Sequence, residues 1–287
     1  MSRTQKYISL SDGRRLGYAE FGDRQGKPLF YCHGFPGSRL EARLADRISC
    51  NMQIRFVGID RPGYGLSSFK AARTISDWAD DVAQLADALG VDRFSILGVS
   101  GGGPYVAACA HQIPHRLNWA GIICGMGPID TPGLTLGMPW IYRRGLLIAG
   151  RFPKIATALY PFSGFFFRHY PKQMLSIISK KVAEPDKMAL NDPDLIDALC
   201  LSFQEAFCSS LRWPAADVVL YSRPWGFDLA DIRIPVYLWH GEKDRIVPPE
   251  MGRYIAQALP DCRATFYVNE GHFSIILNRM KEIWQIF

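Results

Sequence analysis

With 287 residues, of which 48% are hydrophobic and 21% charged, the sequence has an ordinary globular composition and the length for one large α/β domain with an insertion. The formal net charge of +6 comes from scattered basic residues, and no lysine- and arginine-rich run with interleaved aromatics is present, which argues against nucleic-acid binding. Seven dispersed cysteines without a C-x-x-C pair predict reduced thiols and a cytoplasmic protein, and the first six residues lead into no long apolar run, so no signal peptide is expected.

The N-terminal part of the chain predicts strands separated by tight turns. Residues 6–10 and 14–21 alternate around Asp12-Gly13, which predicts an antiparallel hairpin. Apolar runs at 28–32 and 53–60 predict buried strands, each followed by a glycine-containing loop. In the second loop Ser68 stands where a dinucleotide fingerprint needs its third glycine, so no cofactor is expected.

A helix is predicted over residues 74–89, with Thr74 or Ser76 as its N-cap and Gly90 as its stop. The residues that would share its apolar face are Ile75, Trp78, Val82, Leu85 and Leu89.

The central motif is Gly98-x-Ser100-x-Gly102, between a short apolar strand and an alanine-rich helix with proline in its first turn. This strand–turn–helix context predicts a nucleophile elbow, in which the glycines leave room for a sharp, strained turn at the serine. A plain structural turn is one alternative. A phosphate loop is another, but its spacing differs and no Gly-Lys-Ser/Thr follows.

The remaining strands are predicted at 119–124, 235–240 and 264–268, followed by an amphipathic helix. Because strands alternate with helices, we expect a mostly parallel sheet with helices on both faces. Sites in such sheets form at the carboxyl ends of the strands.

Between residues 130 and 227 strand signals disappear and aromatic, helix-like segments take over, which predicts a helical cap inserted in the core. Its most apolar part, residues 140–167, is broken by charged residues and proline and is not a membrane-spanning helix. It could lie on a membrane surface, although a lid over a pocket is favoured. The aromatics considered as pocket-lining, without assigning any one of them, are Trp140, Tyr142, Phe166, Phe167, Phe203, Phe207 and Trp213.

Taken together, these motifs resemble the α/β-hydrolase superfamily. The matching segments are the elbow, the loop at 33–37, the loop at 60–67, Gly241-Glu242-Lys243-Asp244 and Gly271-His272-Phe273, in the family's order over nearly the whole chain. The resemblance implies an α/β fold with an eight-stranded, mostly parallel sheet. The core would comprise residues 1–129 and 228–287, and the cap residues 130–227.

The resemblance also implies a catalytic triad of Ser100 as nucleophile, His272 as base and Asp244 as the acid that orients it. The oxyanion hole would be the backbone N–H groups of Phe35 and Gly101.

Several other polar residues are candidates for the same roles. Glu242 and Asp130 are the rivals of Asp244, and Asp60 is more typical of a structural loop residue. His33 matches the oxyanion loop, where its role is structural, and is not the predicted base. No group of residues has metal-ligand spacing, so no metal is expected.

The predicted function is a serine hydrolase that cleaves a small or medium apolar carboxylic ester through an acyl-serine. The resemblance equally admits lactonases, carbon–carbon bond hydrolases, amidases and aminopeptidases. Ser100 argues against dehalogenases and epoxide hydrolases, which carry aspartate at the elbow, and the elbow departs from the iminopeptidase pattern at Val99 and Gly101. A ligand-binding or signalling protein with a slow triad is the alternative of another class. The expected partner is a small-molecule ester, and the chain is expected to be a monomer or homodimer.

Overall fold

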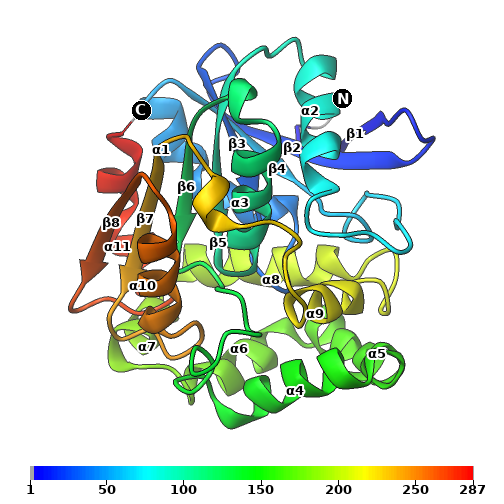
Figure 1. Ribbon diagram of the computed structural model, residues 1–287, viewed down its shortest axis with the longest axis vertical. Coiled ribbons are helices and arrows are strands. Elements are labelled where there is room, and N and C mark those ends of the chain that lie inside the picture. The colour runs from blue at the N-terminus through cyan, green and yellow to red at the C-terminus, as the bar shows by residue number, and fades with distance from the viewer. Residues whose placement is uncertain (1–2, 287) are drawn as a thin grey trace.

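Eight strands form one sheet in the order β1-β2-β4-β3-β5-β6-β7-β8 (Figure 1). The computed structural model describes residues 3–286; Met1, Ser2 and Phe287 lie outside the described residues. β2 pairs antiparallel with β1 and β4, and all other neighbours are parallel, which confirms the predicted fold class. The strands are β1 Lys6–Ser9, β2 Arg15–Gly22, β3 Lys27–Cys32, β4 Ile54–Ile59, β5 Phe94–Val99, β6 Leu117–Ile123, β7 Val236–Gly241 and β8 Cys262–Tyr267.

Helices cover both faces of the sheet, because the central strands send apolar side chains to each side. On β3, Phe30 packs into one core cluster with residues of α2, α3 and α10, whereas Leu29 and Tyr31 pack into another with residues of η1, α1 and α11. The bounds of these elements are η1 Arg39–Ala45, α1 Asp46–Asn51, α2 Trp78–Ala88, α3 Gly103–Gln112, α10 Pro249–Ala258 and α11 Ser274–Trp284. Short 3₁₀ turns lie at η2 Ser100–Gly102, η3 Pro114–Arg116 and η4 Leu229–Asp231.

The helix predicted over residues 74–89 begins later, at Trp78. Thr74 and Asp77 form a separate turn in front of it, because the Thr74 hydroxyl accepts the Asp77 N–H while the Asp77 carboxylate accepts the Thr74 N–H. Thr74 therefore caps the turn before the helix rather than the helix itself.

Between β6 and β7 the chain forms helices α4 to α9 and no strand, and we call these helices the helical block. They are α4 Trp140–Arg151, α5 Pro153–His169, α6 Pro171–Ser179, α7 Glu184–Ala189, α8 Pro193–Ala206 and α9 Ala215–Tyr221. In Figure 1 the block lies below the sheet, with α4, α5 and α6 along the lower edge of the molecule. Among the described residues no helix is both long and apolar enough to cross a membrane.

Candidate active site

Ser100 follows β5 on a strained turn. It has φ 55°, a left-handed conformation that costs a non-glycine residue about 1–3 kcal/mol and persists only where its surroundings impose it. The flanking glycines are required. A Cβ added at Gly98 would lie 2.7 Å from the Gly102 carbonyl oxygen, and one added at Gly102 would lie 2.2 Å from the Cys32 carbonyl oxygen. The geometry is that of a tight elbow at a carboxyl edge of the sheet.

Asp244 and His272 meet although 28 residues separate them. They follow the adjacent parallel strands β7 and β8, and His272 Nδ1 lies 2.7 Å from Asp244 Oδ2. The other carboxylate oxygen of Asp244 accepts the backbone N–H groups of Ile246 at 2.8 Å and Val247 at 2.9 Å. The carboxylate is thus held in one orientation, with Oδ2 turned to the imidazole.

The electrostatics of this pair favour an ionised carboxylate beside a basic histidine. Burial lowers the pKa of His272, but the charge of Asp244 and its hydrogen bond outweigh burial and raise the pKa above its ordinary value of 6.5. Burial raises the pKa of Asp244, but the charge and hydrogen bond of His272 outweigh it and lower the pKa below its ordinary value. Asp244 can therefore fix the ring orientation and stabilise a cation on it.

The loop that carries His272 is anchored to the helical block by Asp186 of α7. Its carboxylate accepts the backbone N–H groups of His272, Phe273 and Ser274 at 2.8–2.9 Å. A Cβ at Gly271 would lie 2.4 Å from an Asp186 oxygen, so only glycine fits there. Asp186 could not be predicted from the sequence, because its partners lie 86 to 88 residues away and no local motif marks it.

Arg61 sets the orientation of the loop at residues 33–37. Its guanidinium donates to the carbonyl oxygen of His33 and to that of Gly34, the latter at 3.0 Å. Since the C=O and N–H of a trans peptide point in opposite directions, the Phe35 N–H is directed away from Arg61. His33 supports this arrangement. Its Nδ1 lies 2.8 Å from the Gly34 carbonyl oxygen. Its Nε2 accepts a hydrogen bond from the backbone N–H of Arg61 at 3.3 Å, so both ring nitrogens have partners.

The elbow presents a second N–H beside the first. The Ser100 carbonyl accepts the Met126 N–H at 3.0 Å, which directs the Gly101 N–H to the opposite side. A Cβ at Gly101 would lie 2.8 Å from the Cβ of Phe35, so these two residues are immediate neighbours. The Tyr221 hydroxyl of α9 lies over them and donates to the Gly101 carbonyl at 2.9 Å.

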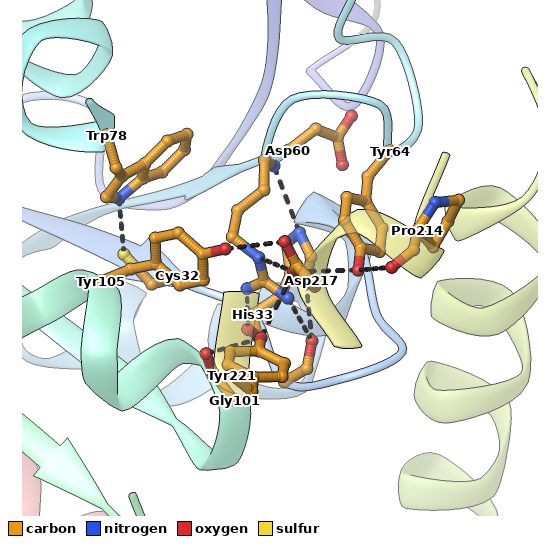
Figure 2. Close-up of polar contacts among 12 residues, drawn as sticks. Cys32, His33, Asp60, Tyr64, Trp78, Gly101, Tyr105, Pro214, Asp217 and Tyr221 are labelled. Carbon is orange, nitrogen blue, oxygen red and sulfur yellow. Dashed lines mark hydrogen bonds and ion pairs between the residues drawn. The ribbon is translucent and has the colours of Figure 1, made fainter. Parts of the chain in front are cut away.

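A buried ionic network joins this loop to the helical block through Asp217 of α9 (Figure 2). The Asp217 carboxylate pairs with Arg61 at 2.8 Å and with Arg73, and it accepts the hydroxyls of Tyr105 at 2.6 Å and Tyr64 at 2.9 Å. Burial alone would raise the pKa of Asp217, but the two guanidinium charges hold it well below its ordinary value. One buried carboxylate from the block thus pairs with two arginines of the core.

Replacing Asp217 with asparagine is expected to lower the free energy of unfolding by about 3–5 kcal/mol, because it leaves buried guanidinium charges without a counter-ion. Chemical denaturation of the variant and of the wild type measures this difference. Asp197→Asn, at an exposed position on α8, is the matched control and should stay within about 0.5 kcal/mol of the wild type. Equal stability of the two variants would mean that the network does not hold the block.

Asp244 and His272, together with Cys124, could alternatively form a metal site. Donor atoms of Cys124, Asp244 and His272 lie within 4.8 Å of one another. Burial raises the pKa of the Cys124 thiol well above its ordinary value, so it remains a neutral thiol, which is a poor ligand. The Asp244 and His272 atoms already bind each other. The donor set fits a hydrogen-bonded pair better than a metal centre.

Among the described residues, the carboxylate that binds the His272 ring is that of Asp244 and not that of either rival. Asp130 is exposed, and Glu242 pairs with Arg253. Asp60 pairs with the buried Arg39 at 2.7 Å. His240 is buried, with Nε2 at 3.6 Å from Asp244, and its closeness to the pair was not expected from the sequence.

Of the seven aromatics predicted as candidates for a pocket lining, Tyr142, Phe167 and Trp213 are half-buried, and the other four are either buried or exposed. Phe203 and Phe207 are buried, in clusters that also contain Phe273 and Tyr64 of the core. Trp140 is 71% exposed and Phe166 36% exposed, so these two do not line an interior pocket. The sequence predicts that such residues share one face of a helix, but it does not show whether that face is buried by other helices or exposed to solvent.

Comparison with known proteins supports the fold described above. The sequence profile of the family described as alpha/beta hydrolase fold matches residues 27–279. A bifunctional esterase/perhydrolase from Acinetobacter calcoaceticus is 24% identical over 275 residues, covering 93% of this chain and 92% of that protein. Among solved structures, a thermophilic esterase from Thermogutta terrifontis superposes with a TM-score of 0.70 at 21% identity, covering 98% of this chain and 96% of that one. The enol-lactonase from Burkholderia xenovorans LB400 gives 0.69 at 17% identity, covering 98% and 97%.

Proposed function

The chain belongs to the alpha/beta hydrolase fold family, and from that premise we propose that it is a serine hydrolase acting on small or medium apolar carboxylic esters. The observation that carries the proposal is the 2.7 Å contact between His272 and Asp244, at the same edge of the sheet as the strained elbow of Ser100. These are the parts that acyl transfer to a serine needs.

In the proposed reaction, the Ser100 hydroxyl oxygen attacks the ester carbonyl carbon while His272 Nε2 takes its proton. The carbonyl oxygen becomes an oxyanion and accepts the N–H groups of Phe35 and Gly101. The intermediate collapses by expelling the alcohol, which takes the proton from His272. Water then attacks the acyl-serine, again giving its proton to His272, and the carboxylic acid leaves as Ser100 regains its hydrogen.

The surroundings of the two N–H groups support an apolar acyl group. The Phe35 ring lies 5.5 Å from that of Tyr221 and 6.0 Å from that of Tyr160, which belongs to α5. Ser100 is only 8% exposed, so an ester held there would be largely removed from water. In this proposal the helical block works as a lid.

We expect the protein to hydrolyse p-nitrophenyl acetate and butyrate faster than longer esters, with a rate that rises with pH through one ionisation. His272 must be neutral to take the Ser100 proton, and its pKa is raised above 6.5. Activity is therefore lost as pH falls through that pKa, and the midpoint should lie on the alkaline side of 6.5. Initial rates between about pH 5 and pH 9 measure this profile.

The matched control is His115→Gln, which removes an exposed histidine and should leave the profile unchanged. A rate that is flat across the range, with binding shown not to limit it, would remove His272 from the role of base. Tight ligand binding without hydrolysis of any ester in the series would favour the binding-protein alternative instead.

A further inference from the structure

Charge is distributed unevenly along the chain. Residues 131–183 contain no aspartate or glutamate, so all 27 acidic residues lie outside this stretch. The stretch nevertheless holds eight of the 33 basic residues, and the rest of the chain carries more acidic than basic residues. The net positive charge of the protein therefore originates here. The eight are Arg143, Arg144, Arg151, Lys154, Arg168, Lys172, Lys180 and Lys181.

The same stretch holds most of the exposed apolar surface. Of the sixteen large hydrophobic side chains that are exposed among the described residues, thirteen lie in it. Phe162 is 75% exposed and Leu159 67%. The thirteen are Leu136, Trp140, Ile141, Leu147, Ile148, Phe152, Ile155, Leu159, Phe162, Phe165, Phe166, Tyr170 and Ile177.

Four of these side chains form a stripe along α5. On α5, Ile155, Leu159, Phe162 and Phe166 follow at intervals of four, three and four residues, which places them on one side of the helix. The Phe162 and Phe166 rings touch, with centroids 5.1 Å apart. We call the exposed apolar and basic side chains of α4, α5 and α6 together the apolar-basic face.

The three helices present this face as one surface. α5 packs against both α4 and α6, and Figure 1 shows all three along the edge of the molecule away from the sheet. None of the ion pairs among the described residues involves a lysine or arginine of residues 131–183. Six of the eight are also exposed, so their charges are available to an external partner: Arg144, Arg151, Lys154, Lys172, Lys180 and Lys181.

Monomeric proteins rarely expose an apolar surface of this continuity without a partner. A second copy of the chain is a poor partner, because it would bring two basic, acid-free surfaces together. An anionic bilayer offers negative headgroups for the lysines and arginines and an apolar interior for the aromatic and aliphatic side chains. Because no described helix can cross a membrane, such contact would be with the surface.

We infer that the apolar-basic face docks on the surface of an anionic phospholipid bilayer. The inference stands on charge and exposure and is independent of the reaction. One consequence does rest on the proposed function. α5 carries both this face and Tyr160, whose ring lies beside Phe35, so docking would bring the site close to esters dissolved in the lipid.

The test is sedimentation of the full-length protein with vesicles, either of phosphatidylcholine alone or with about 30% phosphatidylglycerol. We expect binding to the anionic vesicles that weakens as salt is raised, and little binding to phosphatidylcholine. Replacing Leu159 and Phe162 together with serine should abolish binding. Replacing Arg144, Lys154 and Lys172 together with glutamine should weaken it roughly 100-fold, at about fivefold per charge.

Matched controls lie on other surfaces of the molecule. Met188→Ser with Val268→Ser removes equally exposed apolar side chains, and Arg24→Gln with Arg47→Gln and Arg233→Gln removes the same number of exposed charges. Both controls should bind like the wild type, and thermal unfolding should show every variant folded. Absence of binding to anionic vesicles at low salt overturns the inference. So does a dimer, seen by light scattering, that the Leu159 and Phe162 replacements dissociate and that does not bind vesicles.

Discussion

Ser100→Ala is expected to lower kcat by roughly six orders of magnitude, the loss measured when the nucleophile of a serine hydrolase is removed. The structure gives the reason, because the elbow between Gly98 and Gly102 holds this one side chain at the left-handed φ of 55° beside the neighbouring N–H groups of Phe35 and Gly101. The variant should also lose covalent labelling by a fluorophosphonate. Alanine accepts the same backbone conformation about as well as serine, so the fold should be retained.

The matched control is Ser95→Ala, which removes a buried hydroxyl from β5, the strand that leads into the elbow. Labelling of this variant should equal that of the wild type. Labelling of Ser100→Ala at full stoichiometry would place the nucleophile elsewhere. Slow residual hydrolysis would not, since the oxyanion hole and substrate binding still contribute without the serine.

Asp244→Asn is expected to lower kcat by roughly 10⁴-fold, through the tautomer of His272 rather than through the fold. The backbone N–H groups of Ile246 and Val247 hold one side-chain oxygen of residue 244 in place. The asparagine oxygen will keep those bonds and turn its NH₂ group towards His272 Nδ1. His272 Nδ1 must then accept a hydrogen bond from this NH₂ group, so the ring proton moves to Nε2. A protonated Nε2 can no longer take the proton of Ser100.

Asp130→Asn is the matched control, because Asp130 is one of the two rival acids and is exposed. It should change kcat by less than about tenfold. The comparison is made on kcat with one p-nitrophenyl ester, after circular dichroism has shown both variants folded. The opposite ranking of the two variants would transfer the role of the acid to the end of β6.

Much of the site was predictable because its parts are local. Ser100 is marked by glycines two residues to either side, and Asp244 and His272 each follow a short apolar strand in a recognisable turn. The order of parallel strands then brings β7 and β8 together, so the contact between Asp244 and His272 follows from two local signals and one rule of topology.

The supports of the site were not predictable in this way. Arg61 and Asp217 lie 156 residues apart, and nothing near either one indicates a partner. Asp186 binds the His272 loop from a short helix whose sequence suggests only a helix start. Each of these contacts depends on how the helical block is seated on the core, which is decided by packing over the whole interface.

The sequence by itself determined the sheet, the elbow and the residue types at the strand ends, because backbone strain, strand periodicity and turn chemistry act over a few neighbouring residues. Tertiary structure decided that Asp186 binds the His272 loop and that Asp217 pairs with Arg61 behind the loop at residues 33–37. It also decided on which side of α4 and α5 the apolar residues lie. Trp140 and Phe166 have the same local pattern whether they face a pocket or solvent, and only the packing of the block left them outside. The physical reason is that burial and ion pairing are properties of surroundings assembled from distant segments, whereas a turn carries its cause within its own sequence.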